Sequence, residues 1–145
     1  MGVGFAMLAL FLGIIGFAAV ADGISPPSHI QTVDPTKVAQ TPPFDHPGLV
    51  KRGPGEYDAY YVAHVFAFDP ATLRVPAGSR VTFYVTSPDV VHGMMIVGTD
   101  INLMVIPGWV NSGSHIFRTA GTYLVACNEY CGAGHQMMAA KIEVQ

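Results

Sequence analysis

Hydrophobic residues fill the start of the chain without interruption, and no charged side chain occurs from Met1 to Ala21. The length of this run matches the roughly 20 apolar residues that cross a bilayer as a helix. A cleaved signal peptide is the alternative, because Ala19-Val20-Ala21 resembles a cleavage site, but the basic residues that usually precede a signal core are absent. We therefore predict a transmembrane anchor over residues 1–22, and either interpretation places the rest of the chain outside the cytoplasm.

Prolines dominate the next stretch, residues 23–55, which holds seven of the 11 prolines and shows little hydrophobic periodicity. Proline removes a backbone donor and fixes φ, so segments rich in it are usually extended and irregular. We predict a Pro-rich linker here that packs in part on its own domain or on a partner subunit. His29 and His46 lie in it and need no functional role.

From residue 56 onward, short runs of aromatic and β-branched residues alternate with turns that contain Pro, Gly or Asp. This pattern is typical of strands and lacks a helical period. The predicted strands are residues 57–68, 73–75, 81–86, 92–97, 101–106, 110–118, 122–127 and 139–144. About eight closely spaced strands indicate an all-β Greek-key sandwich or barrel over residues 56–145.

Composition limits the partners. Half of the residues are hydrophobic, 12% are charged, and the net charge is −3 without a basic cluster. A nucleic-acid-binding protein usually carries a basic patch, so we expect no nucleic acid as a partner. A chain of 145 residues has room for one domain of ordinary size.

The most specific chemical signal is the loop between the last two predicted strands. It contains the only two cysteines, Cys127 and Cys131, followed by His135 and Met138. Thiolates, imidazole and thioether form a soft ligand set that suits copper and disfavours magnesium, calcium or manganese. His92 follows a Ser-Pro-Asp turn, and a β-fold could bring this second imidazole to the same point.

Two simpler interpretations of the cysteines are open. They could form a disulfide in an extracytoplasmic domain, where oxidising conditions permit one. A mononuclear blue-copper site needs only one cysteine, so the second argues against that site. The metal-ligand spacing of the whole loop is the more specific signal.

Several neighbouring residues have less certain roles. Either Met137 or Met138 could supply the thioether, and Asp89 could orient an imidazole or lie on the surface as an ordinary acid. The remaining residues are expected to pack in strands or in the core rather than bind a metal; they are His64, Phe66, Phe68, Met94, Met95, Met104 and His115.

The pattern Cys-x-Glu-x-Cys-Gly-x-x-His-x-x-Met, with Asp-Val-x-His upstream, resembles the dinuclear copper A domain of cytochrome c oxidase subunit II. The resemblance covers residues 56–145, and the single anchor is similar to that of the B-type haem-copper oxidases. It implies a cupredoxin fold and selects Met138 over Met137. By resemblance, Cys127 and Cys131 bridge two copper ions, and His92 and His135 each bind one of them.

The same resemblance implies two weak ligands, Met138 and the backbone carbonyl of Glu129. In many members of the family the corresponding glutamate carboxylate helps to bind magnesium at the boundary with subunit I, so a magnesium contact through Glu129 is a further expectation. Its other ligands would come from another chain.

The implied function is electron transfer. A cytochrome c-like donor gives electrons to the copper centre, which passes them to haem in oxidase subunit I for the reduction of oxygen to water. The copper domain then lies on the periplasmic side of the cell membrane. The alternatives are a membrane-anchored copper carrier or assembly protein and the copper A module of another reductase, such as nitrous oxide reductase.

Overall fold

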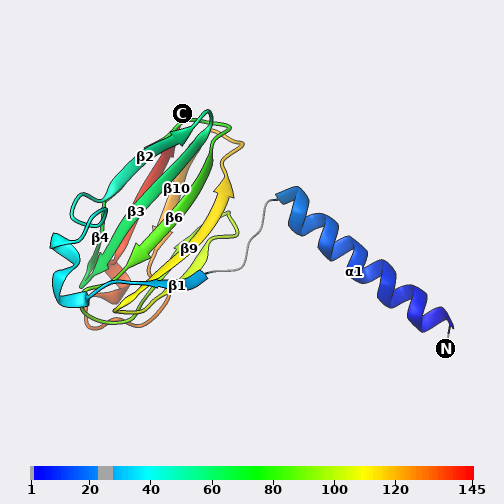
Figure 1. Ribbon diagram of the computed structural model, residues 1–145, viewed down its shortest axis with the longest axis horizontal. Coiled ribbons are helices and arrows are strands. Elements are labelled where there is room, and N and C mark those ends of the chain that lie inside the picture. The colour runs from blue at the N-terminus through cyan, green and yellow to red at the C-terminus, as the bar shows by residue number, and fades with distance from the viewer. Residues whose placement is uncertain (1, 23–27) are drawn as a thin grey trace.

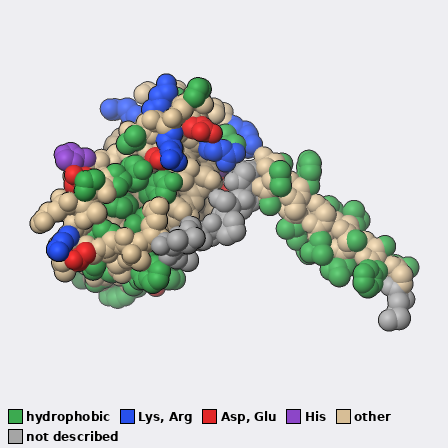
Figure 2. Space-filling model, viewed as in Figure 1, with side chains coloured by type: hydrophobic (Ala, Val, Ile, Leu, Met, Phe, Trp, Pro, Cys, Tyr) green, Lys and Arg blue, Asp and Glu red, His purple; other side chains and the backbone are tan. Residues whose placement is uncertain are grey.

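The computed structural model describes residues 2–22 and 28–145. Its one long helix, α1 (Gly2–Asp22), lies apart from the strands (Figure 1) and is covered with hydrophobic side chains (Figure 2). The stretch Gly2–Ala21 has a mean hydropathy of 2.5, and none of its residues is buried within the chain. An N-terminal apolar helix is therefore confirmed. By length and composition it fits a membrane anchor, although a signal sequence meets the same criteria.

The strands form two sheets. The first follows the order β1-β9-β6-β3-β2 and lies as one layer in Figure 1, with β4 paired to β3. Its strands are β1 (Ser28–Thr32), β2 (Gly48–Gly53), β3 (Glu56–His64), β4 (Ala67–Asp69), β6 (Arg80–Thr86) and β9 (Trp109–Ile116). The second follows the order β5-β11-β10-β7-β8. Its strands are β5 (Thr72–Val75), β7 (His92–Ile96), β8 (Asn102–Val105), β10 (Gly121–Ala126) and β11 (Ala139–Val144).

Neighbouring strands in these sheets are often distant in the sequence. β3 pairs with β6 and β11 with β5 in parallel, whereas the other ladders are antiparallel. Non-sequential neighbours of this kind are characteristic of Greek-key sandwiches. The predicted all-β sandwich is confirmed.

The main core fills the space between the sheets. In β6 the alternate residues Val81, Phe83 and Val85 are fully buried, as expected for a strand with one face toward a core. In β11 the same alternation buries Ala140, Ile142 and Val144. The hydrophobic alternation read from the sequence therefore set which face of each strand points inward.

The stretch expected as an irregular linker differs from that expectation where it is described. β1 pairs with β9 and β2 pairs with β3, so both strands extend the first sheet at its edges. The prolines in the described stretch fall between these strands, where no ladder donor is needed. Residues 23–27 lie outside the described part of the chain.

A second hydrophobic cluster joins this stretch to the sheet. Val33, Val38 and Phe44 pack with Val62 and Val110 on the face of the first sheet that points away from the main core, and we call these five residues the outer cluster. The 3₁₀ helix η1 (Pro35–Gln40) carries Val38, and Asp34 caps its first turn by accepting the Thr36 amide. Residues 33–55 are thus packed onto the domain by hydrophobic contacts.

All eight predicted strands occur, and the longest one divides. Residues 57–68 form β3 and β4, separated by a turn at Val65 and Phe66. This turn lies close to the loop between β10 and β11, as shown below, and it brings two segments together that the sequence does not connect.

Candidate metal centre

The ends of the cysteine-containing loop are fixed by the second sheet. β10 and β11 pair from Gly121 with Val144 to Ala126 with Ala139, and the Cys127 amide then donates to the Met138 carbonyl at 3.2 Å. The loop between them turns back through η2 (His135–Met137). Its first and last residues are therefore held side by side by the sheet.

Three loop side chains converge on one sulfur. Cys131 Sγ lies 3.8 Å from Cys127 Sγ, 3.7 Å from Met138 Sδ and 3.6 Å from His135 Nδ1. Both cysteines are free and buried. A disulfide has a sulfur–sulfur bond of about 2.05 Å, so this geometry holds two separate thiols.

His92 reaches the same point from β7, which pairs with β10. Its side chain is fully buried, and one of its ring nitrogens lies within 4.8 Å of both cysteine sulfurs. Nε2 is 2.9 Å from Asp89 Oδ1, whereas the buried Nδ1 has no hydrogen-bond partner among the described residues. Nδ1 is therefore the nitrogen available to a metal.

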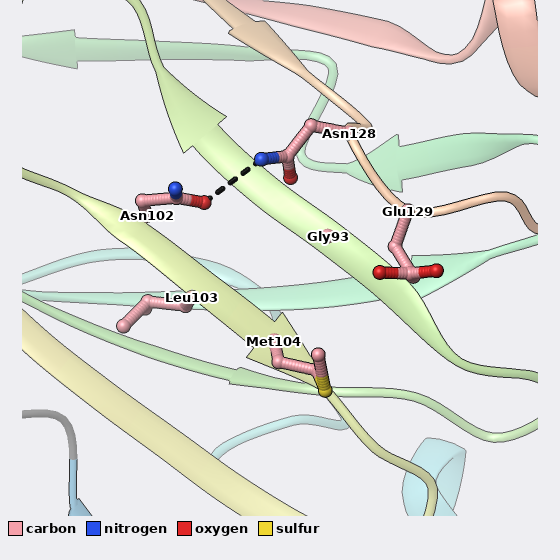
Figure 3. Close-up of a pocket in the computed structure, with 6 residues that line it drawn as sticks. All are labelled: Gly93, Asn102, Leu103, Met104, Asn128 and Glu129. Carbon is pink, nitrogen blue, oxygen red and sulfur yellow. Dashed lines mark hydrogen bonds between the residues drawn. The ribbon is translucent and has the colours of Figure 1, made fainter.

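Glu129 contributes in two directions. Its backbone carbonyl lies 3.2 Å from Cys127 Sγ, at the edge of the sulfur cluster. Its carboxylate lines a separate open pocket of about 240 Å³ (Figure 3). The residues around this pocket are Gly93, Asn102, Leu103, Met104, Asn128 and Glu129.

The two candidate thioethers differ clearly in position. Met138 is buried beside Cys131, whereas the Met137 side chain is 78% exposed. Of the methionines expected in the core, Met94 is fully buried, but Met104 is 53% exposed, and that expectation was wrong. β8 lies at the edge of its sheet and alternates its side chains, so residue 104 points outward while Leu103 and Val105 point inward.

The other histidines with described side chains lie outside the cluster. His46 and His115 are paired with Asp45 and Asp100, and His64 lines a different pocket near η1. Among the histidines with described side chains, His92 and His135 are the ones that lie near the cysteine sulfurs. The side chain of His29 lies outside the described part of the chain.

Phe66 covers the loop, although ordinary strand packing was expected for it. A Cβ atom added at Gly132 or Gly134 would lie 2.9 or 2.6 Å from its ring, so the ring occupies space that any side chain at those positions would need. Phe68, by contrast, is buried in the main core, as expected for strand packing. Spacing along the chain gives no signal for the contact between Phe66 and the loop.

The electrostatics of the site favour a bound cation. Burial and the adjacent Cys127 thiol raise the pKa of Cys131 to about 11, because a thiolate there lacks solvation. Burial also opposes ionisation of Asp89, but hydrogen bonds from His92, from the Val65 and Val90 amides and from Ser87 lower its pKa overall. A bound metal would replace the thiol protons and supply the missing positive charge.

The donor set fits a soft metal. Two thiols, a thioether and two imidazoles surround a buried point, and one imidazole nitrogen has no other partner. Metal–thiolate bonds of about 2.3 Å, the length found at zinc sites, are long enough for both sulfurs to bind one ion. Soft ligands of this kind select copper, zinc or iron–sulfur centres over magnesium or calcium.

Comparison with known proteins gives a consistent result. Residues 62–145 match the family model described as cytochrome c oxidase subunit II, periplasmic domain. Cytochrome c oxidase subunit 2 of Thermus thermophilus is 40% identical over 144 residues, which cover 97% of this chain and 86% of the relative.

Two solved structures agree with this match. A chain of a heme-copper terminal oxidase dimer is 34% identical and superposes with a TM-score of 0.77, covering 99% of this chain and 95% of that chain. Auracyanin A, a blue copper protein of Chloroflexus aurantiacus, is 16% identical with a TM-score of 0.50 over 62% of this chain and 99% of its own. The second likeness concerns the fold alone, and it confirms the cupredoxin-like sandwich.

Proposed function

The chain belongs to the cytochrome c oxidase subunit II family, and we propose that it holds a dinuclear copper A centre through which electrons enter a haem-copper oxidase. The observation that carries the proposal is the convergence of His92 with Cys127 and Cys131 at one buried point. A mononuclear blue-copper site uses only one cysteine, whereas two thiolates can bridge two copper ions.

Each ligand has a proposed role that follows the family pattern. Cys127 and Cys131 bridge the two copper ions, and His92 and His135 each bind one of them. Met138 and the backbone carbonyl of Glu129 are the weak ligands. Their positions support these roles, because each lies next to a cysteine sulfur.

Bound copper supplies a one-electron redox couple, and the chain provides a rigid, dry setting for it. The ladder between β10 and β11 fixes both ends of the loop, and β7 holds His92 beside them. Cys127, Cys131 and Met138 are buried in the main core. Fixed ligands and an apolar shell reduce the rearrangement that accompanies a change of charge and tune the redox potential.

The remaining proposals concern the assembly. α1 anchors the chain in the cell membrane, and the copper domain faces the periplasm. A cytochrome c-like protein donates electrons, and haem in subunit I receives them and reduces oxygen. Magnesium binding through Glu129 is proposed as well; its carboxylate lines an open pocket rather than the sulfur cluster.

Electron paramagnetic resonance of the copper-loaded full chain in detergent tests the proposal. An electron shared equally between two coppers gives hyperfine structure from both nuclei. A metal analysis should then find two coppers per chain. A single-copper pattern, or one copper per chain, would contradict the dinuclear site.

A second measurement separates the oxidase subunit from a copper carrier. Haem is expected to co-purify with the chain when the chain is isolated from membranes. The membranes should consume oxygen when they are supplied with reduced cytochrome c. A carrier would instead lose its copper to a mild chelator and co-purify no haem.

A further inference from the structure

The Asp89 carboxylate connects two turns that lie near the proposed copper site. Its Oδ1 accepts hydrogen bonds from the Ser87 hydroxyl at 3.0 Å and from the Val90 amide at 2.6 Å. The same oxygen lies 2.9 Å from His92 Nε2. Its Oδ2 accepts from the Val65 amide at 2.8 Å. One carboxylate thus holds the turn before β7 with one oxygen and the turn between β3 and β4 with the other.

The Val65 turn carries the ring that covers the loop. Phe66 directly follows Val65, and its ring fills the space over Gly132 and Gly134. Gly132 also has φ +128, a conformation that other residues rarely adopt. The loop is therefore shaped to receive this ring, and the ring's position depends on a turn that Asp89 holds.

We propose that Asp89 is a positioning residue that sets both the orientation of His92 and the position of Phe66 over the copper loop. The proposal rests on the proposed copper function for its metal-dependent part. It extends that function, because it joins a ligand from one sheet and a cover from the other through one side chain.

Two physical consequences follow. An acceptor at Nε2 fixes the tautomer in which Nε2 carries the proton, so Nδ1 keeps the lone pair with which it would bind a metal. Phe66 is 40% exposed, and its ring covers part of Gly132 and Gly134, which are both half-buried. Losing the carboxylate should therefore turn the imidazole and loosen the cover together.

The test compares Asp89→Asn with Asp100→Asn in the full chain in detergent. Asp100 also accepts from a histidine, His115, but lies outside the metal cluster, so its variant is a matched control. An asparagine has one acceptor oxygen and cannot serve the Val65 amide and His92 as the carboxylate does. Asp89→Glu restores the carboxylate and should rescue part of the loss.

Three readouts are needed, two on the metal-free protein and one on the copper-loaded protein. In the metal-free protein, nitrogen NMR reports the tautomer of His92, and hydrogen exchange reports the protection of the Val65 amide. In the loaded protein, competition with a chelator reports copper affinity, which we expect to fall by about 10–100-fold, the usual effect of losing a partner of a metal-bound histidine. Asp100→Asn should leave all three unchanged.

The outcomes separate this inference from the copper proposal. If Asp89→Asn leaves the tautomer, the amide protection and the copper affinity as in the wild type, the positioning role is refuted. If the wild type itself binds no copper pair, the copper proposal fails, while the metal-free readouts still decide whether Asp89 ties the two turns.

Phe66→Ala guards against a variant that fails to fold. It keeps the carboxylate and removes only the cover, so we expect the shared-electron spectrum to persist while a chelator removes copper faster. When Asp89→Asn and Phe66→Ala are combined, the loss of copper-binding free energy should be smaller than the sum of the two separate losses, because both substitutions act on the same turn. Additive losses would contradict the connection.

Discussion

Two regions of the sandwich each bury a polar side-chain atom that lacks a hydrogen-bond partner in the described part of the chain, and their surroundings differ. At the metal end the atom is His92 Nδ1, beside two thiols. In the main core it is the hydroxyl of Tyr61, which is packed among apolar side chains with the Phe83 ring centroid 6.3 Å from its own. An unpaired buried atom costs free energy in both places.

The difference shows when such an atom indicates a ligand site. Around His92 the neighbours are donors that the same metal ion can bind, so a ligand would remove the cost for all of them. Around Tyr61 no donor set of this kind is present among the described residues, and burial simply raises the pKa of the phenol. A bound metal would offset this free-energy cost in the first region, whereas the hydrophobic packing of the rest of the core offsets it in the second.

Cys131→Ser tests the metal end and should have the largest effect. Cys131 contacts Cys127, His135 and Met138, so its loss should abolish the shared-electron resonance and lower the copper content below two per chain. Resonance spectra and metal analysis measure both. Met137→Leu is the control, since that side chain is largely exposed and should change neither. A wild-type spectrum from Cys131→Ser would refute bridging.

Phe44→Ala tests whether the outer cluster, which lies partly in the predicted linker, contributes to the stability of the domain. Phe44 is 6% exposed and packs edge-on against Tyr60 at 5.8 Å between ring centroids. Truncating a buried phenylalanine costs about 3–5 kcal/mol of unfolding free energy. Denaturant unfolding of the copper-free chain measures this loss.

The matched control for this prediction is Val50→Ala, at a half-exposed position of β2. It should change the unfolding free energy by about 0.5 kcal/mol or less, as surface substitutions usually do. If both variants change the unfolding free energy by equally small amounts, residues 33–55 are only loosely attached to the domain.

Gly93→Ala tests how closely the metal end is packed. A Cβ there would lie 2.0 Å from Asn128 Oδ1 and 2.9 Å from the Glu129 amide, so the loop would have to shift. Overpacking of this kind typically costs about 1–3 kcal/mol. We expect a comparable loss of unfolding free energy and an altered copper hyperfine pattern.

Gly53→Ala provides the comparison, because its Cβ would meet nothing nearer than 3.8 Å. It should leave the copper spectrum unchanged. An unchanged spectrum in Gly93→Ala as well would mean that the loop tolerates a displacement next to His92.

The sequence predicted the strands of the second sheet and the central strands of the first sheet well, but it did not predict the two edge strands of the first sheet, β1 and β2. β6 and β11 alternate clearly between apolar and polar residues, so their positions and inward faces followed from the period. β1 and β2 are short edge strands among prolines, and β2 buries none of its residues fully. Neither strand therefore shows the hydrophobic alternation from which a strand is predicted. Their pairing depends on neighbours that the local sequence does not specify.

The site divides in a similar way. The convergence of the loop side chains was predictable because their short spacing keeps them close, and Asp89 was a candidate because it precedes His92 by three residues. The contact of Phe66 with Gly132 and Gly134 was not predictable, since it joins a turn of the first sheet to a loop of the second. Only the packing of the two sheets brings them together.

Tyr61→Phe should have the smallest effect and tests the other side of the comparison. Removing the hydroxyl removes a buried donor without a partner, so we expect the chain to gain about 1 kcal/mol of unfolding free energy. The gain should be equal with and without copper, because Tyr61 is not part of the metal cluster. Tyr60→Phe is the matched control: its hydroxyl donates to Asp58 at 3.3 Å, so this variant should lose stability by about 0.5–1.5 kcal/mol. If Tyr61→Phe instead destabilises the chain or changes the copper spectrum, its hydroxyl has a role that the packing of the core does not reveal, and the contrast between the two buried atoms fails.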